Sequence, residues 1–245
     1  MYGWRARIGV IVSPPNTVVE GEFPQMAPEG VSVHAARLGR PQGLSGQLGG
    51  DVVLRTNEDL PRAAASLAEL ALDAVVFAHT SGSMLRGTKY DTELTAMLEE
   101  TVGCPAVTTA SAVVAILRAC GAVRLALLTP YPEEMTLAEI DYLEKAVSGL
   151  KVVSHRSMEM TTGLGIGDLE PTVVYRESRK VDLAQADALF LSGTNWRTIE
   201  VIEDMEADLG KPVFTANQVT MWATLRKLGI APKPGYGSVF AYQLP

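Results

Sequence analysis

The feature that most constrains the fold is a regular alternation between short apolar runs and longer stretches with helical periodicity. The apolar runs are rich in Val, Ile, Leu, Ala or Phe, lead into polar turns, and cover residues 7–12, 74–78, 106–107, 124–128, 188–191 and 213–214. Helical spacing covers residues 60–72, 111–119, 133–147, 199–209 and 218–228. Near-continuous apolar strands are typical of parallel sheets that helices cover on both faces. The pattern therefore predicts an α/β fold of the doubly wound class.

The chain also repeats itself at a separation of roughly 110 residues, which is too long for a solenoid. Residues 103–108 (Gly-Cys-Pro-Ala-Val-Thr) match residues 210–215 (Gly-Lys-Pro-Val-Phe-Thr), and Asp73 and Asp187 open corresponding apolar runs. We therefore expect two pseudosymmetric domains, each with a mostly parallel sheet flanked by helices. The expected bounds are 1–120 and 121–225, with a last strand at about 226–245 returning to the first domain. Ligands bind at the carboxyl ends of strands in such sheets, and in a two-domain duplication these ends can face each other across a cleft.

Charge and composition indicate which kinds of binding partner the chain can have. The chain has 245 residues and a formal net charge of −7, with no cluster of basic residues. Nucleic acid and anionic membrane surfaces are therefore poor partners, and no apolar stretch approaches the ~20 residues of a membrane span. The first residues lack the apolar core of a signal peptide, so we expect a cytoplasmic protein that acts on a small molecule. The same features are compatible with a homo-oligomer.

Polar side chains gather where the predicted strands end. They are Ser13, Asn16, Thr17, Thr80, Ser81, Ser83, Tyr131, Thr194 and Asn195. Helix N-termini, with their free N–H groups and positive dipole end, favour carboxylate or phosphate at such places. The alternative is that each residue only caps a helix or forms a turn. Because both repeats carry the set, we favour an anion-binding cleft.

Other motifs give weaker signals. Gly163, Gly165 and Gly167 resemble a dinucleotide-binding turn, but no convincing strand precedes them and the last spacing is wrong. The three histidines show no metal-ligand spacing, and we expect His34 and His155 on strands or at the surface. His79 differs because it ends a buried apolar run, where it is either a structural histidine or an acid or base. We expect neither a metal nor a cofactor.

Several motifs together resemble one family across nearly the whole chain. They are residues 5–20 (Arg-x-Arg-Ile-Gly-Val-Ile-Val-x-Pro-x-Asn-Thr-x-x-Glu), 80–83 (Thr-Ser-Gly-Ser), 129–131 (Thr-Pro-Tyr), 194–198 (Thr-Asn-Trp-Arg-Thr), 210–213 (Gly-Lys-Pro-Val), 217–218 (Asn-Gln) and 235–237 (Gly-Tyr-Gly). The chain is similar to the maleate cis-trans isomerase and arylmalonate decarboxylase group of the cofactor-independent aspartate/glutamate racemase superfamily. The resemblance implies two pseudosymmetric α/β domains with the active site between them. It also implies a small carboxylate substrate held by Asn16, Tyr131, Asn195 and the Thr80–Ser81 loop.

One departure from this family decides which chemistry can be expected. The family isomerases and racemases carry a cysteine immediately before each of the two threonines, and the decarboxylases keep only the second. Here His79 and Gly193 occupy these positions, and Cys104 and Cys120 lie outside the motifs, where small apolar fillers suffice. Thiolate chemistry therefore does not carry over. His79 remains as the one titratable group, with an ordinary pKa suited to proton transfer near pH 7.

The sequence therefore predicts a cofactor-independent decarboxylase for a small mono- or dicarboxylate, in which His79 delivers a proton from one side. Thr80, Ser81, Thr194 and Asn195 would hold the oxyanion that remains after CO₂ leaves. Gly193 would leave space for substrate. The alternatives are a cis-trans isomerase, racemase or hydratase with altered catalytic residues, and a catalytically silent carboxylate-binding protein.

Overall fold

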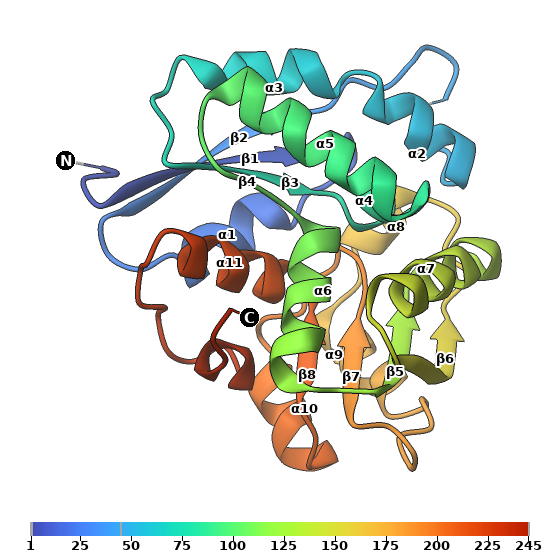
Figure 1. The fold of residues 1–245 in the computed structure, drawn as a ribbon. Coiled ribbons are helices and arrows are strands. Elements are labelled where there is room, and N and C mark those ends of the chain that lie inside the picture. Colours follow the sequence, from blue (N-terminus) through green and yellow to red (C-terminus); the bar gives the residue numbers. More distant parts are fainter. Residues whose placement is uncertain (1, 45, 245) are drawn as a thin grey trace.

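Two parallel sheets form the centre of the molecule (Figure 1). The computed structural model describes residues 2–44 and 46–244. The first sheet has the order β2-β1-β3-β4, with β1 (Ala6–Val12), β2 (Val31–Arg37), β3 (Ala74–Ala78) and β4 (Ala106–Thr108). The second has the order β6-β5-β7-β8, with β5 (Arg124–Thr129), β6 (Lys151–Ser157), β7 (Ala188–Leu191) and β8 (Val213–Thr215). The identical strand order and the parallel pairing confirm the predicted pair of pseudosymmetric α/β units.

Helices cover both sheets. Their bounds are α1 (Val19–Met26), α2 (Gly50–Asn57), α3 (Leu60–Ala68), α4 (Thr80–Met84), α5 (Gly87–Val102), α6 (Thr109–Cys120), α7 (Glu133–Ala146), α8 (Gly163–Gly167), α9 (Pro171–Ser178), α10 (Ile202–Leu209) and α11 (Ala216–Lys227). In Figure 1, α3 and α5 lie over one face of the first sheet. Helix α11 packs on α6 and α1 and also contacts β3, β4 and β8, so it touches both sheets. The predicted boundary at residue 120 falls at the end of α6, and the division into 1–120 and 121–225 stays a prediction.

Residues that correspond in the sequence repeat have equivalent structural roles in the two halves. Asp73 accepts a hydrogen bond from the backbone N–H of Arg7 at 2.8 Å, and Asp187 accepts one from Arg124 at 2.9 Å. Thr108 and Thr215 begin α6 and α11 with side-chain capping boxes. His79 and Gly193 are therefore equivalent positions in the two halves, with His79 one residue beyond β3 and Gly193 two residues beyond β7.

The prediction of a final strand is wrong. Within residues 226–244 the structure contains a 3₁₀ helix, Ser238–Ala241, and no strand. Pro232 and Pro234 have no N–H to donate to a sheet ladder, which accounts for the difference. The segment instead packs on α11, where the indole Nε1 of Trp222 donates to the carbonyl oxygen of Tyr242 at 3.0 Å.

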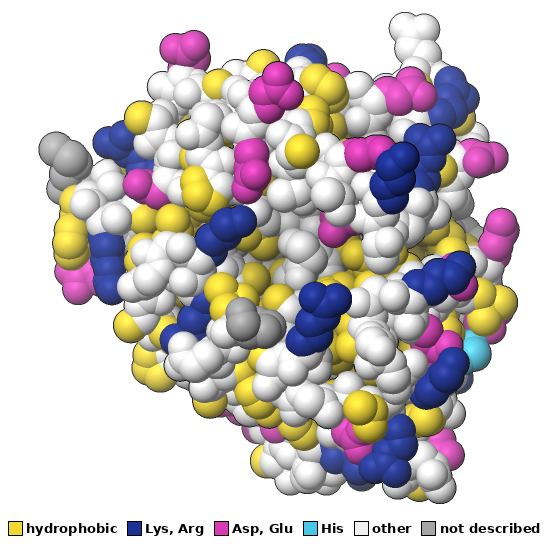
Figure 2. Space-filling view, in the orientation of Figure 1, with side chains coloured by type: hydrophobic (Ala, Val, Ile, Leu, Met, Phe, Trp, Pro, Cys, Tyr) yellow, Lys and Arg dark blue, Asp and Glu magenta, His cyan; other side chains and the backbone are white. Residues whose placement is uncertain are grey.

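None of the helices described within residues 2–44 and 46–244 has the length and apolar character needed to cross a membrane. On the face that Figure 2 shows, Lys and Arg side chains are intermingled with Asp and Glu rather than gathered into one patch.

Candidate active site

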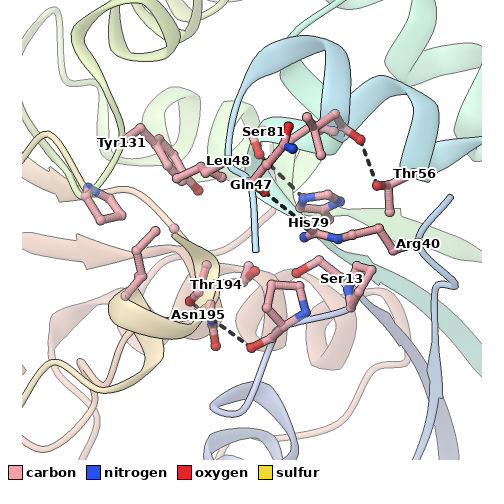
Figure 3. Close-up of a pocket in the computed structure, with 18 residues that line it drawn as sticks. Ser13, Arg40, Gln47, Leu48, Thr56, His79, Ser81, Tyr131, Thr194 and Asn195 are labelled. Carbon is pink, nitrogen blue, oxygen red and sulfur yellow. Dashed lines mark hydrogen bonds between the residues drawn. The ribbon is translucent and has the colours of Figure 1, made fainter. Parts of the chain in front are cut away.

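A small cavity of about 40 Å³ lies where the carboxyl ends of the two sheets face each other. The segments that follow β1, β3, β5 and β7 all reach it, and α2, α8 and the segment after β2 complete its wall (Figure 3). The lining residues are Ser13, Pro14, Pro15, Arg40, Gln47, Leu48, Val52, Val53, Thr56, His79, Ser81, Pro130, Tyr131, Gly163, Ile166, Gly193, Thr194 and Asn195. The strand-end cleft predicted from the sequence is therefore present, although the size of this cavity suits only a small ligand.

His79 is the titratable side chain in this cavity whose ordinary pKa lies nearest to neutrality. It is 8% exposed, directly precedes α4, and has its Nε2 3.5 Å from the Ser81 hydroxyl oxygen. Burial, together with the positive charge of Arg40, lowers the pKa of His79 to about 4. The imidazole is therefore neutral at pH 7. This differs from the titration near neutrality expected from the sequence, because burial penalises the charged form.

Arg40 is a cavity residue that the sequence analysis missed. Its Nη1 donates to the carbonyl oxygens of Leu44 at 2.8 Å and Gln47 at 2.7 Å, which holds the guanidinium close to His79 (Figure 3). The lining residues include no Asp or Glu. A guanidinium in such a wall can pair with a carboxylate through charge-assisted hydrogen bonds. Arg40 reaches the cavity only through the tertiary fold, and it belongs to no local sequence motif that could have predicted it as a site residue.

Tyr131 and Gly193 lie against each other on the opposite wall. A Cβ atom at residue 193 would be 3.2 Å from the Tyr131 hydroxyl oxygen and 3.2 Å from Pro130 Cγ. Gly193 also has a φ of +115°, a backbone conformation that other residues rarely adopt. Burial and the nearby Glu139 raise the pKa of Tyr131 above its ordinary value, so its phenol stays protonated and can donate.

The amides of Asn16 and Asn195 bind the backbone of neighbouring loops. Asn16 Nδ2 donates to the Thr194 carbonyl oxygen at 3.2 Å, and its Oδ1 accepts from the N–H groups of Val18 and Val19, both at 3.0 Å. Asn195 Oδ1 accepts from the Thr17 N–H at 2.8 Å, while its Nδ2 donates to two further carbonyl oxygens. Asn195 lines the cavity and Asn16 does not. Their expected role as carboxylate ligands stays a prediction.

The hydroxyl residues divide in the same way. Ser81 and Thr194 line the cavity, and Thr194 Oγ1 donates to the carbonyl oxygen of Ala78 at 3.0 Å. Thr80 is fully buried beside the cavity without lining it. The structure therefore brings six of the eight predicted site residues together, which are His79, Ser81, Tyr131, Gly193, Thr194 and Asn195.

The remaining candidates lie elsewhere. Cys104 and Cys120 do not line the cavity, and burial raises the pKa of both thiols, which agrees with the expectation of apolar fillers. His34 and His155 lie on β2 and β6, as expected, with the latter's Nε2 2.8 Å from Glu133 Oε1. The glycine motif 163–167 is the short helix α8. Among residues 2–44 and 46–244, no three His, Cys, Asp or Glu side chains are placed to hold a metal ion.

Two facing α/β halves enclose a small cavity whose wall carries a cation, an imidazole and hydroxyl donors, so the class is a pseudosymmetric α/β protein with a site between its sheets. The chain belongs to the arylmalonate decarboxylase family, whose model matches residues 8–240. It is 29% identical over 247 residues to the arylmalonate decarboxylase of Bordetella bronchiseptica, covering 95% of each chain.

Solved maleate isomerases have the same fold. The Pseudomonas putida enzyme, crystallised as a variant with maleate, is 26% identical with a TM-score of 0.89, covering 97% of this chain and 98% of that one. The Nocardia farcinica maleate cis-trans isomerase, solved with a covalently bound succinylcysteine intermediate, is 25% identical with a TM-score of 0.88, covering 96% and 98%. These relatives are enzymes, which supports an enzyme in general for this chain.

Proposed function

We propose that this chain is a cofactor-independent decarboxylase of a small mono- or dicarboxylate, and that His79 returns one proton to the carbon that loses CO₂. The observation that carries the proposal is the composition of the cavity wall. It has one guanidinium and one imidazole, with neither a carboxylate nor a thiol among the lining residues. Such a wall favours an anionic ligand and leaves a single side chain suited to move a proton.

The cavity of this chain has no thiol among the described residues of its wall, unlike a relative whose cysteine forms a covalent intermediate. The Nocardia farcinica isomerase is described with a succinylcysteine intermediate, in which a cysteine is bonded to the four-carbon acid. Neither cysteine of this chain reaches the cavity. Decarboxylation does not require a covalent bond between protein and substrate, since it requires a stabilised anion and a proton.

The proposed step balances with the groups present. For a dicarboxylate with both carboxylates on one carbon, the bond between that carbon and the departing carboxylate breaks, and its electron pair stays on carbon and spreads onto the remaining carboxylate. Arg40 and the hydroxyls of Ser81 and Tyr131 stabilise this enediolate. A proton then moves from His79 Nε2 to carbon, and the neutral imidazole takes another proton from solvent. Each CO₂ released therefore consumes one proton.

His79 has to gain a proton when substrate is bound. In the unliganded cavity burial and Arg40 keep its pKa at about 4. A substrate carboxylate beside Arg40 offsets that positive charge and favours the imidazolium. Substrate binding and proton uptake are therefore coupled in this mechanism.

Turnover of a panel of malonates and of maleate tests the proposal. The expected result is CO₂ release and, in D₂O, a product carrying one deuterium in a single configuration. His79→Asn should keep substrate binding and lower turnover by roughly 10²–10⁴-fold, the usual worth of a positioned acid or base. Full turnover in this variant contradicts the role of His79. Binding without any product identifies a silent carboxylate-binding protein.

A second function is favoured by the low pKa of His79. An imidazole that is neutral at pH 7 is already a base, so it could remove a proton next to a carboxylate in a racemase, isomerase or hydratase. Conversion of maleate without CO₂ release, or exchange of an α-hydrogen with D₂O, would favour this alternative over decarboxylation.

A further inference from the structure

Two buried polar atoms next to the cavity lack hydrogen-bond partners. They are Nδ1 of His79 and Oδ1 of Asn57, and neither has a partner among the residues that the structure describes. Asn57 is 4% exposed and ends α2, whereas His79 directly precedes α4. Buried polar atoms are nearly always paired in folded proteins, so two such neighbours call for an explanation.

Both atoms face the same small space, which Gly82 leaves open. A Cβ atom at residue 82 would lie 2.4 Å from His79 Nδ1 and 3.0 Å from Asn57 Oδ1. Gly82 lies inside α4, in a helical conformation that any residue can adopt. The glycine is therefore required here because a side chain would collide with His79 and Asn57, and not because of its backbone conformation.

The chemistry of the pair is complementary. Asn57 Nδ2 donates to the Gly82 carbonyl oxygen at 2.7 Å and to the Tyr90 hydroxyl at 3.2 Å, so the amide is turned with its oxygen toward the gap. An amide oxygen can only accept. The imidazole nitrogen that faces it has to donate, which requires the neutral tautomer with hydrogen on Nδ1.

We propose that Asn57 is a positioning residue that fixes the tautomer of His79. Its Oδ1 accepts a hydrogen bond from His79 Nδ1–H across the gap at Gly82, after a small rotation of the ring or through one water. The other nitrogen, Nε2, then carries its lone pair toward Ser81 and the cavity. Nε2 is thereby the atom that takes up and delivers the proton, while Nδ1 stays protonated throughout.

The tautomer of His79 does not depend on the reaction, whereas the catalytic role of Nε2 rests on the proposed function. The tautomer and the proposed reaction can therefore be tested separately. The direct test is ¹⁵N NMR of the imidazole nitrogens of the unliganded protein at pH 7, with His79→Asn used to assign the signals among the three histidines. We expect the His79 spectrum of the Nδ1–H tautomer.

Two substitutions test the role of Asn57. Asn57→Leu removes the acceptor and should move His79 toward the Nε2–H tautomer. Gly82→Ala fills the gap and should do the same by displacing the ring. Tyr90→Phe is the matched control, since it removes a partner of Asn57 Nδ2 and leaves Oδ1 untouched, so the tautomer should not change.

The kinetic expectation is a fall of kcat of about 10- to 100-fold in Asn57→Leu with little change in KM, the range seen when the hydrogen-bond partner of a metal-bound histidine is removed. An Nε2–H tautomer in the unaltered protein overturns the proposal, as does an unchanged tautomer in both Asn57→Leu and Gly82→Ala. If the NMR result holds while no carboxylate in the panel is turned over, the positioning stands and the proposed reaction fails.

Discussion

Asn195 and Thr17 are joined by a 2.8 Å hydrogen bond that links the loop after β7 to the loop after β1. Asn16 strengthens the same junction by donating to the carbonyl oxygen of Thr194. The two amides therefore hold the two halves together at the edge of the cavity.

We predict that Asn16→Ala and Asn195→Ala each lower the free energy of unfolding by about 1–3 kcal/mol, because buried backbone groups lose their partners. Thermal unfolding should show a fall of several degrees. Asn16→Asp is the informative comparison, since it keeps an acceptor for the N–H groups at the start of α1 but sets a carboxylate oxygen against the carbonyl oxygen of Thr194. Unchanged stability together with lost carboxylate affinity would instead make the two amides substrate ligands.

His79 should make stability depend on acid. Its pKa is about 4 in the folded protein and 6.5 when unperturbed, so between these values the unfolded chain takes up a proton that the folded chain does not. Stability is thus unaffected above pH 6.5 and falls as the pH drops toward 4, by on the order of 3 kcal/mol. Denaturant unfolding of the protein and of His79→Asn across this range measures the difference. Parallel pH profiles would mean that His79 keeps its ordinary pKa.

Arg40→Met should affect both affinity and the imidazole. Loss of the cation should weaken carboxylate binding by about 10- to 100-fold, the range of a charge-assisted hydrogen bond. The pKa of His79 should also rise, because Arg40 contributes to its depression. Calorimetric titration with a small dicarboxylate and NMR titration of His79 measure the two effects. A variant with unaltered affinity would place the carboxylate elsewhere in the cavity.

Gly193→Cys, which places a thiol at this position, should lower the free energy of unfolding by more than a cysteine at another glycine of positive φ. The new Cβ would press on Pro130 and the Tyr131 hydroxyl, at a φ that costs about 1–3 kcal/mol. Gly210→Cys is the matched control, since Gly210 has a φ of +62° with open space around it. Equal unfolding temperatures for the two variants would show that the wall near Tyr131 yields without cost.

Glu139 should act on stability in the opposite direction to His79. Burial raises the pKa of its carboxyl to about 7, although the Ser192 hydroxyl donates to it at 2.8 Å. The folded chain holds a proton that the unfolded chain releases, so stability is fully present below pH 4.5 and is lost as the pH rises to about 7. Glu139→Gln should therefore gain stability relative to the unaltered protein at pH 8. A variant that loses stability at every pH would show that the charged carboxylate is required.

Much of the fold could be predicted because its inner strands are largely apolar and buried. The bounds of β3 and β7 agree with the sequence prediction, since both are buried along their whole length. The outer strands β2 and β6 escaped prediction because they are only partly buried and mix polar with apolar residues. The expected strand in the last segment is absent among its described residues, and Pro232 and Pro234 account for the difference.

The site could be predicted only where a residue adjoins a strand end. His79 and Thr194 follow β3 and β7, so topology alone brings them to the cavity. Arg40 lies three residues beyond β2, a strand that the sequence did not predict, and Asn57 ends α2, so neither position could be assigned from a predicted strand end. The lowered pKa of His79 could not be predicted from the sequence, because it results from burial in the folded protein rather than from neighbouring residues in the chain.

The equivalence of His79 and Gly193 has a consequence for handedness. In a twofold assembly of identical chains, equivalent positions carry the same residue, so both faces of a bound molecule would meet the same group. One continuous chain is free of that symmetry and can carry an imidazole on one side and a bare backbone on the other. A flat, achiral intermediate of the proposed reaction would then receive hydrogen on one face alone, and we expect a single enantiomer as the product.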